Sequence, residues 1–190
     1  MSRMITVGAA QLGPIARSEK RSDVVKRLVS LLGQAHARGC DLAVFPELAL
    51  TTFFPRWWME DQREIDAFFE GEMPGPETRP LWDEAARLGL AFCIGYAELC
   101  REGDVVRRYN TSILVDRGGR LVGKYRKVHL PGHADHQAWR PFQHLEKRYF
   151  DVGDLGFPVW RALGGVLGMC ICNDPAGPRR IESWGCREWR

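Results

Sequence analysis

The chain has 190 residues, 45% of them hydrophobic and 27% charged, a composition typical of a globular domain with a sizeable core. Its net charge is only +3, and basic residues are interleaved with acidic ones, which argues against nucleic-acid binding. No apolar run reaches the roughly 20 residues of a membrane span, and no signal-peptide pattern opens the chain. We therefore expect a cytoplasmic protein that binds neither nucleic acid nor membrane and keeps its six cysteines reduced.

The first half of the chain alternates between strand and helix patterns. Short apolar runs predict buried strands, and apolar side chains at a 3.6-residue period predict a helix that Ser22 caps and Gly39 ends. An aromatic loop at residues 53–58 precedes two further helical patterns. The expected strands lie at residues 5–11, 41–45 and 90–99, and the expected helices at residues 22–38, 60–70 and 76–88.

Strand patterns dominate the second half. Residues 128–150 are the exception, because they carry four of the five histidines in a long polar and aromatic segment typical of a site-lining loop. We predict the α/β class with mixed sheets, with helices too few to cover every sheet face. The expected strands lie at residues 110–115, 121–127 and 166–172, with a turn at residues 116–119 and an edge segment at residues 153–160.

Three reactive side chains stand where expected strands end. Glu47 follows one apolar run, Lys127 closes a second, and Cys172 closes a third. A free thiol with a pKa of about 8.5 is only a few per cent ionised at neutral pH, so nucleophilic attack needs a base. Glu47 fits that base, and Lys127 fits a cation for the charge that develops on the attacked group. The three together indicate covalent catalysis.

Each of these residues also has a simpler interpretation when taken alone. Cys172 is typical of a small buried hydrophobe, Glu47 of a solvated or capping carboxylate, and Lys127 of a surface charge that closes a hairpin. The spacing of the residues leaves both interpretations open. Cys170 and Cys172 are too close together for the usual zinc pair, and no second pair complements them, so we expect no metal.

Three segments resemble the signature segments of the nitrilase superfamily of carbon-nitrogen hydrolases, in that family's order and spacing. They are residues 45–48 (FPEL), 123–130 (GKYRKVHL) and 170–174 (CICND). Longer stretches resemble one branch, the N-carbamoyl-D-amino acid amidohydrolases, at residues 46–56, 110–116 and 140–150. The resemblance implies that residues 1–174 are the N-terminal part of a carbon-nitrogen hydrolase domain.

The resemblance also implies a fold and an activity. The family's fold is a four-layer α-β-β-α sandwich with mixed sheets, which we expect to be incomplete at the C-terminus here. The implied reaction is hydrolysis of an N-carbamoyl-D-amino acid to the D-amino acid, carbon dioxide and ammonia through a cysteine thioester, with no cofactor. The partner is thus a small N-carbamoyl amino acid, and the intact family member is expected to be a homo-oligomer.

Site roles follow from the same resemblance, residue by residue. Cys172 matches the nucleophile, Glu47 the general base and Lys127 the oxyanion-stabilising cation. Supporting roles fall on Glu146, a second carboxylate that positions substrate and lysine, on His129 and His144, which line the carbamoylase pocket, and on Asn173, which supplies an oxyanion N–H. A structural hydrogen bond is the alternative for the two histidines.

The resemblance stops after Asp174. Family members continue with two arginines that hold the substrate carboxylate, whereas Pro175 and Ala176 stand here. Codons read one base out of frame from Pro175 can spell the family's continuation. Our hypothesis is therefore that residues 175–190 are an unrelated, frameshifted tail, and the gene's nucleotide sequence tests it. We expect this truncation to impair activity.

Three other functions remain open at this stage. Another branch of the superfamily, an aliphatic amidase or a nitrilase, would use the same three residues, so hydrolysis of a carbamoyl substrate but not of a nitrile would separate them. A non-catalytic fragment or binding module would carry the residues as a relic. A metal-binding module is a more distant alternative.

Overall fold

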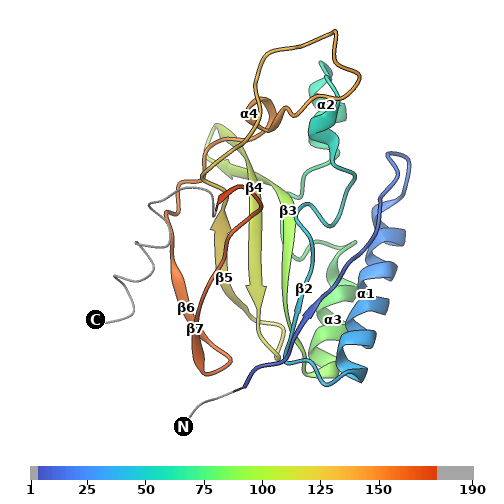
Figure 1. The fold of residues 1–190 in the computed structure, drawn as a ribbon, viewed down its shortest axis with the longest axis vertical. Coiled ribbons are helices and arrows are strands. Elements are labelled where there is room, and N and C mark those ends of the chain that lie inside the picture. The colour runs from blue at the N-terminus through green and yellow to red at the C-terminus, as the bar shows by residue number, and fades with distance from the viewer. Residues whose placement is uncertain (1–3, 175–190) are drawn as a thin grey trace.

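The computed structural model describes residues 4–174, so the expected tail at residues 175–190 lies outside the described part. Five strands form one mixed sheet in the order β1-β2-β3-β4-β5 (Figure 1). The first three strands are mutually parallel, and β3, β4 and β5 are antiparallel neighbours. The strands are β1 (Val7–Ala9), β2 (Leu42–Val44), β3 (Ala91–Glu102), β4 (Val105–Val115) and β5 (Leu121–Arg126).

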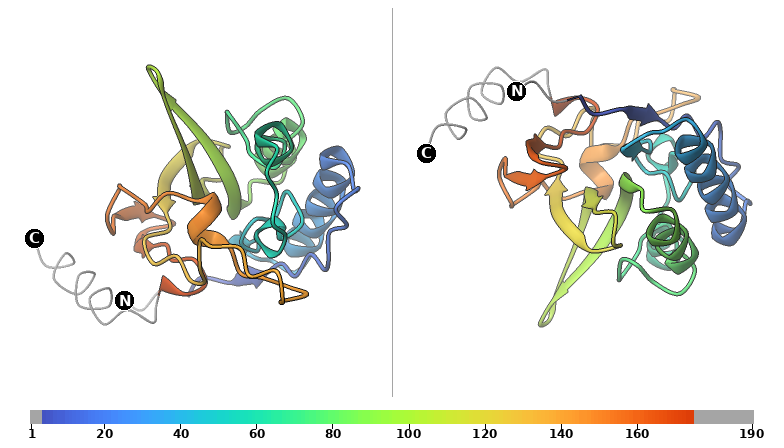
Figure 2. Two further views of the ribbon diagram at one scale, coloured as in Figure 1. Left: turned by 90° about the horizontal axis from the view of Figure 1, so that it is seen from above. Right: turned by 90° about the horizontal axis from the view of Figure 1, so that it is seen from below.

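Two helices, α1 (Arg21–Ala37) and α3 (Arg79–Leu88), lie side by side on one face of this sheet (Figures 1 and 2). The apolar stripe of α1 and side chains from alternate positions of β3 and β4 build the largest apolar cluster. Gly89 adopts the left-handed conformation and ends α3. None of the helices in the described residues has the length and hydropathy needed to span a membrane.

A second, two-stranded sheet covers part of the opposite face. It is the hairpin of β6 (Val159–Ala162) and β7 (Gly165–Gly168), which packs beside β5. A Cβ built at Gly123 of β5 would lie 2.4 Å from the Trp160 ring, so only glycine permits this close approach. The described residues thus supply a helical layer, a five-stranded sheet and part of a second sheet. The predicted α/β class with a mixed sheet is confirmed.

The remaining short helices gather at one end of the large sheet (Figure 1). They are η1 (Phe54–Arg56), α2 (Gln62–Asp66) and α4 (Glu146–Tyr149). An aromatic cluster centred on Phe54 holds them together, and the Tyr149 hydroxyl donates to the Trp57 carbonyl at 2.6 Å. This end is where the chain leaves β2 and β5, so the cluster builds one wall around the residues that follow those strands.

Three local expectations were wrong. The helix begins at Arg21, with Lys20 as its N-cap residue, so Ser22 lies inside the first turn. The expected strand at residues 166–172 ends at Gly168, and Cys172 lies in the turn that follows. The β3–β4 pairing continues to Glu102 and Val105, well beyond the strand patterns, and forms a long projecting hairpin (Figure 2).

Gly95 lets the segment after β2 cross close to β3. A Cβ at Gly95 would lie 2.8 Å from Glu47 Cα and 2.9 Å from the Pro46 carbonyl oxygen. The two segments exchange main-chain hydrogen bonds here, because Gly95 N–H donates to Pro46 O at 3.2 Å and Ala49 N–H donates to Gly95 O at 2.8 Å. The glycine thus sets the position of Glu47.

We predict that Gly95→Ala lowers the free energy of unfolding by about 1–3 kcal/mol, because the added methyl group forces the main chain at Glu47 outward. The matched control is Gly33→Ala in α1, where an added Cβ meets no atom within 4 Å. That control should be neutral or stabilising by up to about 1 kcal/mol. Urea unfolding measures both, and equal unfolding free energies would contradict the steric argument.

Candidate active site

Lys127 is the centre of the site. It directly follows β5, and its side chain is fully buried between two carboxylates. Its Nζ donates to Glu47 Oε1 and to Glu146 Oε2, each at 2.7 Å. The main chain is fixed as well, because Lys127 N–H donates to Asn110 O at 2.8 Å and Lys127 O accepts from Gly153 N–H at 2.9 Å. The ammonium group therefore has one defined position.

Glu47 is held by two donors from the sheet. Besides the Lys127 ammonium, the Asn110 side-chain amide of β4 donates to Glu47 Oε1 at 2.6 Å. Asn110 is completely buried, whereas the Glu47 side chain keeps 22% of its surface exposed. The carboxylate is thus oriented from the sheet side and open on the other side.

Glu146 begins α4 and is 1% exposed. One of its carboxylate oxygens accepts from Lys127, and the other, Oε1, lies 2.9 Å from His144 Nε2. The His144 ring packs edge-on against Phe53, with ring centroids 5.5 Å apart. Glu146 therefore connects the buried ammonium to a half-exposed histidine at the edge of the site.

The electrostatic balance keeps Lys127 charged. Burial by itself lowers the pKa of an ammonium group, but the charges and hydrogen bonds of Glu47 and Glu146 outweigh it and raise the pKa of Lys127 above its ordinary value. The group is a permanent cation at neutral pH. It can therefore stabilise a negative charge that develops beside it.

Cys172 lies in the turn after β7 with a φ of 44°, a left-handed conformation that is uncommon for a residue with a side chain. Burial, the charge of Glu47 and the charge of Glu146 raise the pKa of its thiol, and Lys127 opposes the shift; a hydrogen bond with Glu47 adds to it. Glu47 and Cys172 both line one cavity of about 300 Å³. The resting group is thus a neutral thiol that shares a cavity with its candidate base.

Asp174 anchors the turn that carries the thiol. This fully buried carboxylate accepts from Ile171 N–H and from His129 N–H, each at 3.0 Å, and lies 3.3 Å from His129 Nδ1. His129 also stacks on Phe157 at 6.0 Å. The structure thus places His129 against the turn, and Asn173 lies exposed beside Cys172.

The structure brings the three strand-end residues of the sequence analysis into one site, with Glu146 and His144 beside them. Sequence reasoning gave no role to Asn110 or Asp174. The sequence carries no clear signal for Asn110, because it stands among the polar residues Arg108, Thr111 and Ser112 of β4. Within the described residues, no group of three or more histidine, cysteine or acidic side chains is arranged to hold a metal ion.

This geometry can perform acyl transfer. A thiol with an adjacent carboxylate can lose its proton as it attacks, and a fixed ammonium group can stabilise the resulting oxyanion. The open side of Glu47 leaves room for a water molecule to be activated afterwards. The same three groups could serve both halves of a covalent reaction.

We predict that the pH midpoint for alkylation of Cys172 by iodoacetamide is higher than that of a free thiol, because the site disfavours the thiolate. Glu47→Gln removes a negative charge and should move the alkylation midpoint down, whereas Lys127→Met removes the cation and should move it up. Peptide mass spectrometry across a pH series measures the midpoints. Shifts in the same direction for both variants would contradict the charge assignment.

Comparison with known proteins shows what the chain is similar to. Formamidases from Bacillus cereus (strain AH820) and Bacillus anthracis are each 29% identical to it over 171 residues, which cover 87% of this chain and 45% of the relative. The chain thus spans less than half the length of these curated relatives.

Solved structures share the fold. A carbon-nitrogen hydrolase from Helicobacter pylori G27 has a TM-score of 0.75 at 23% identity, covering 95% of this chain and 56% of its own. Saccharomyces cerevisiae Nit3, a member of branch 10 of the nitrilase superfamily, has a TM-score of 0.70 at 21% identity, covering 92% and 58%. The NitN amidase from Nesterenkonia sp. AN1 has a TM-score of 0.68 at 21% identity, covering 94% and 60%.

The model of one protein family also matches the sequence directly. It is that of the carbon-nitrogen hydrolases, and the match covers residues 6–179, which include all three segments that carry the candidate site. Because this match extends over most of the chain, the chain belongs to the carbon-nitrogen hydrolase family.

Proposed function

We propose that this site hydrolyses the C–N bond of small amides through a thioester on Cys172. The observation that carries the proposal is the Lys127 ammonium, fixed at 2.7 Å from both Glu47 and Glu146 beside a neutral thiol. Replacing a buried ion pair by apolar side chains of similar volume is often neutral for stability, so stability alone gives no reason for this one. Its position beside a nucleophile supports a catalytic role.

In the first half of the reaction, Glu47 takes the proton from the Cys172 thiol as sulfur attacks the carbonyl carbon. The C–S bond forms and the carbonyl electrons move to oxygen, where the Lys127 ammonium and the N–H of Asn173 stabilise the oxyanion. Collapse of this intermediate breaks the C–N bond. The protonated Glu47 then gives its proton to the departing amine, which leaves an acyl thioester.

In the second half, a water molecule replaces the amine. Glu47, again ionised, takes a proton from the water as its oxygen attacks the thioester carbon. The second oxyanion uses the same stabilising groups. Its collapse breaks the C–S bond, and Glu47 returns its proton to the departing sulfur, which restores both the thiol and the ionised carboxylate. In this scheme Glu146 holds Lys127 in place, and His144 and His129 face the substrate and the nucleophile turn.

Our finer proposal is that the substrates are N-carbamoyl-D-amino acids, in which the attacked carbon is the ureido carbonyl. Its support is the resemblance of residues 46–56 and 140–150 to that branch, together with the placement of His144 beside Glu146. The products would be the D-amino acid, carbon dioxide and ammonia. A homo-oligomer in the cytoplasm remains our expectation for the intact enzyme.

A second candidate is a short aliphatic amide. The formamidases at 29% identity favour it, as does the Nesterenkonia amidase, for which solved complexes show acrylamide added at the active-site cysteine and butyramide bound. The chemistry at sulfur would be identical. The group attached to the attacked carbon and the departing amine would both differ.

We predict that ammonia release from an N-carbamoyl-D-amino acid or from formamide falls roughly 10³-fold or more in Cys172→Ala, because the nucleophile is lost. Cys170→Ala, two positions away on the same exposed turn, is the matched control and should retain the wild-type rate. The ratio of the wild-type hydrolysis rates on the two substrates separates the carbamoylase branch from the formamidase branch. Equal, measurable ammonia release by wild type and Cys172→Ala would refute the thioester mechanism, whereas no release by wild type would favour a non-catalytic module.

A further inference from the structure

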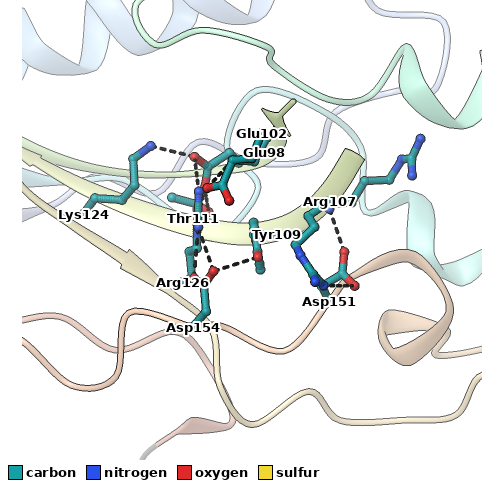
Figure 3. A network of polar contacts seen from close by, with 11 residues as sticks. Glu98, Glu102, Arg107, Tyr109, Thr111, Lys124, Arg126, Asp151 and Asp154 are labelled. Atoms are coloured by element: carbon teal, nitrogen blue, oxygen red, sulfur yellow. Dashed lines mark hydrogen bonds and ion pairs between the residues drawn. The ribbon is translucent and has the colours of Figure 1, made fainter. Parts of the chain in front are cut away.

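Arg126 directly precedes Lys127 and points to the opposite face of the sheet, because successive side chains of a strand alternate. Lys127 therefore enters the candidate active site, whereas Arg126 enters a separate network of charged residues behind it (Figure 3). The Arg126 side chain is only 7% exposed. A buried guanidinium next to the central lysine has no role in the chemistry described above.

Two carboxylates hold Arg126 in place through its planar fork. Its Nε and Nη2 donate to the two oxygens of Glu98 at 2.9 and 3.0 Å, and its Nη1 donates to the two oxygens of Asp154 at 2.9 and 3.2 Å. Bidentate pairing of this kind fixes orientation as well as distance. Arg126 thus joins β3 to the segment that follows residue 150.

Both carboxylates are fixed in turn by their own donors. Thr111 Oγ1 and Lys124 Nζ donate to Glu98 at 2.7 and 2.6 Å, and Tyr109 Oη donates to Asp154 at 2.9 Å. The Tyr109 ring lies 3.9 Å from the guanidinium carbon. The network therefore spans β3, β4, β5 and the segment beyond residue 150 (Figure 3).

The segment held by Asp154 also holds the main chain of Lys127. Gly153, the residue before Asp154, donates its N–H to Lys127 O at 2.9 Å. A Cβ at Gly153 would lie 2.1 Å from Arg126 O, so these two segments of the main chain are in direct contact. Arg126 and Gly153 thus fix the main chain on both sides of Lys127, at the peptide unit before it and at the peptide unit after it.

We propose that Arg126 is a positioning residue, which holds Lys127 at hydrogen-bonding distance from both Glu47 and Glu146. The proposal rests on the proposed function only in giving that position a catalytic purpose. The charged network behind Lys127 transmits no proton and contacts no substrate. It holds the peptide unit so that the ammonium meets the oxyanion, and a misplacement of about 1 Å at such a group can cost roughly 10²-fold in rate.

The test uses Arg126→Lys, which keeps the positive charge but cannot bridge Glu98 and Asp154 with one planar fork. The readout is the alkylation of Cys172 by iodoacetamide across a pH series in a Cys170→Ala background. The charged groups that face this thiol are Glu47 after β2, Lys127 after β5 and Glu146 of α4, and Lys127 alone among them favours the thiolate. Displacement of Lys127 therefore moves the alkylation midpoint up.

We expect the alkylation rate of Arg126→Lys at about pH 8 to fall roughly threefold or more, in the direction of Lys127→Met. The matched control is Arg107→Lys in the exposed Arg107–Asp151 pair, whose atoms are 3.7 Å apart, and it should leave the midpoint unchanged. Thermal unfolding confirms that each variant is folded at the assay temperature. An unchanged midpoint in folded Arg126→Lys, or an equal shift in the control, would overturn the proposal.

Asp154→Asn is the second variant, because its carboxylate is half exposed and its loss spares the Glu98 pair. It should shift the midpoint in the same direction by a smaller amount, and no shift in folded Asp154→Asn would overturn the proposal even where Arg126→Lys fails to fold. The assay needs no turnover, so a shift without any amide hydrolysis in the wild type would refute the proposed function alone. Where turnover is present, kcat should fall and KM stay unchanged.

Discussion

The structure depends on one buried ammonium group. Removing the Lys127 side chain from water costs several kcal/mol, and two charge-assisted hydrogen bonds at 2.7 Å offset that cost. Their acceptors come from the segment after β2 and from α4, which are far apart in the sequence. The sheet, the aromatic cluster around Phe54 and the tight crossing at Gly95 all serve to bring these acceptors to the same cation.

Backbone strain is concentrated at the same place. Among the described residues other than glycine, φ is positive at Leu48, Leu163 and Cys172, and two of these three are the thiol itself and the neighbour of Glu47. Such conformations persist only where the surroundings fix them. The turn of Cys172 is fixed by the hydrogen bonds that the Asp174 carboxylate accepts. The main chain around Leu48 is fixed by the hydrogen bonds of Pro46 and Ala49 with Gly95. Both strained positions are therefore held by hydrogen bonds in which main-chain N–H groups are the donors.

Sequence patterns predicted the parts of the fold that follow a simple period. Buried strands and the apolar stripe of α1 were recognisable, and so were Glu47, Lys127 and Cys172, because polar residues at the ends of apolar runs stand out. The helix start predicted at Ser22 was wrong because a tertiary contact outweighs the local capping preference. Arg21 pairs with Glu70, and the helix begins at Arg21. Asn110 was missed because its side-chain partner, Glu47, lies in the turn after β2, and a contact between segments so far apart has no local signature in the sequence.

The two layers contribute unequal shares of the site. Lys127 follows β5 and contacts both Glu47 after β2 and Glu146 of α4. Cys172 instead follows the β6–β7 hairpin, in which the Trp160 ring lies close to Gly123 of β5. The ion-paired half can therefore persist when the hairpin opens. The distance between the sulfur and its candidate base therefore depends on how firmly the β6–β7 hairpin docks on the large sheet, so a substitution at Trp160 or Gly123 can disturb the site from outside it.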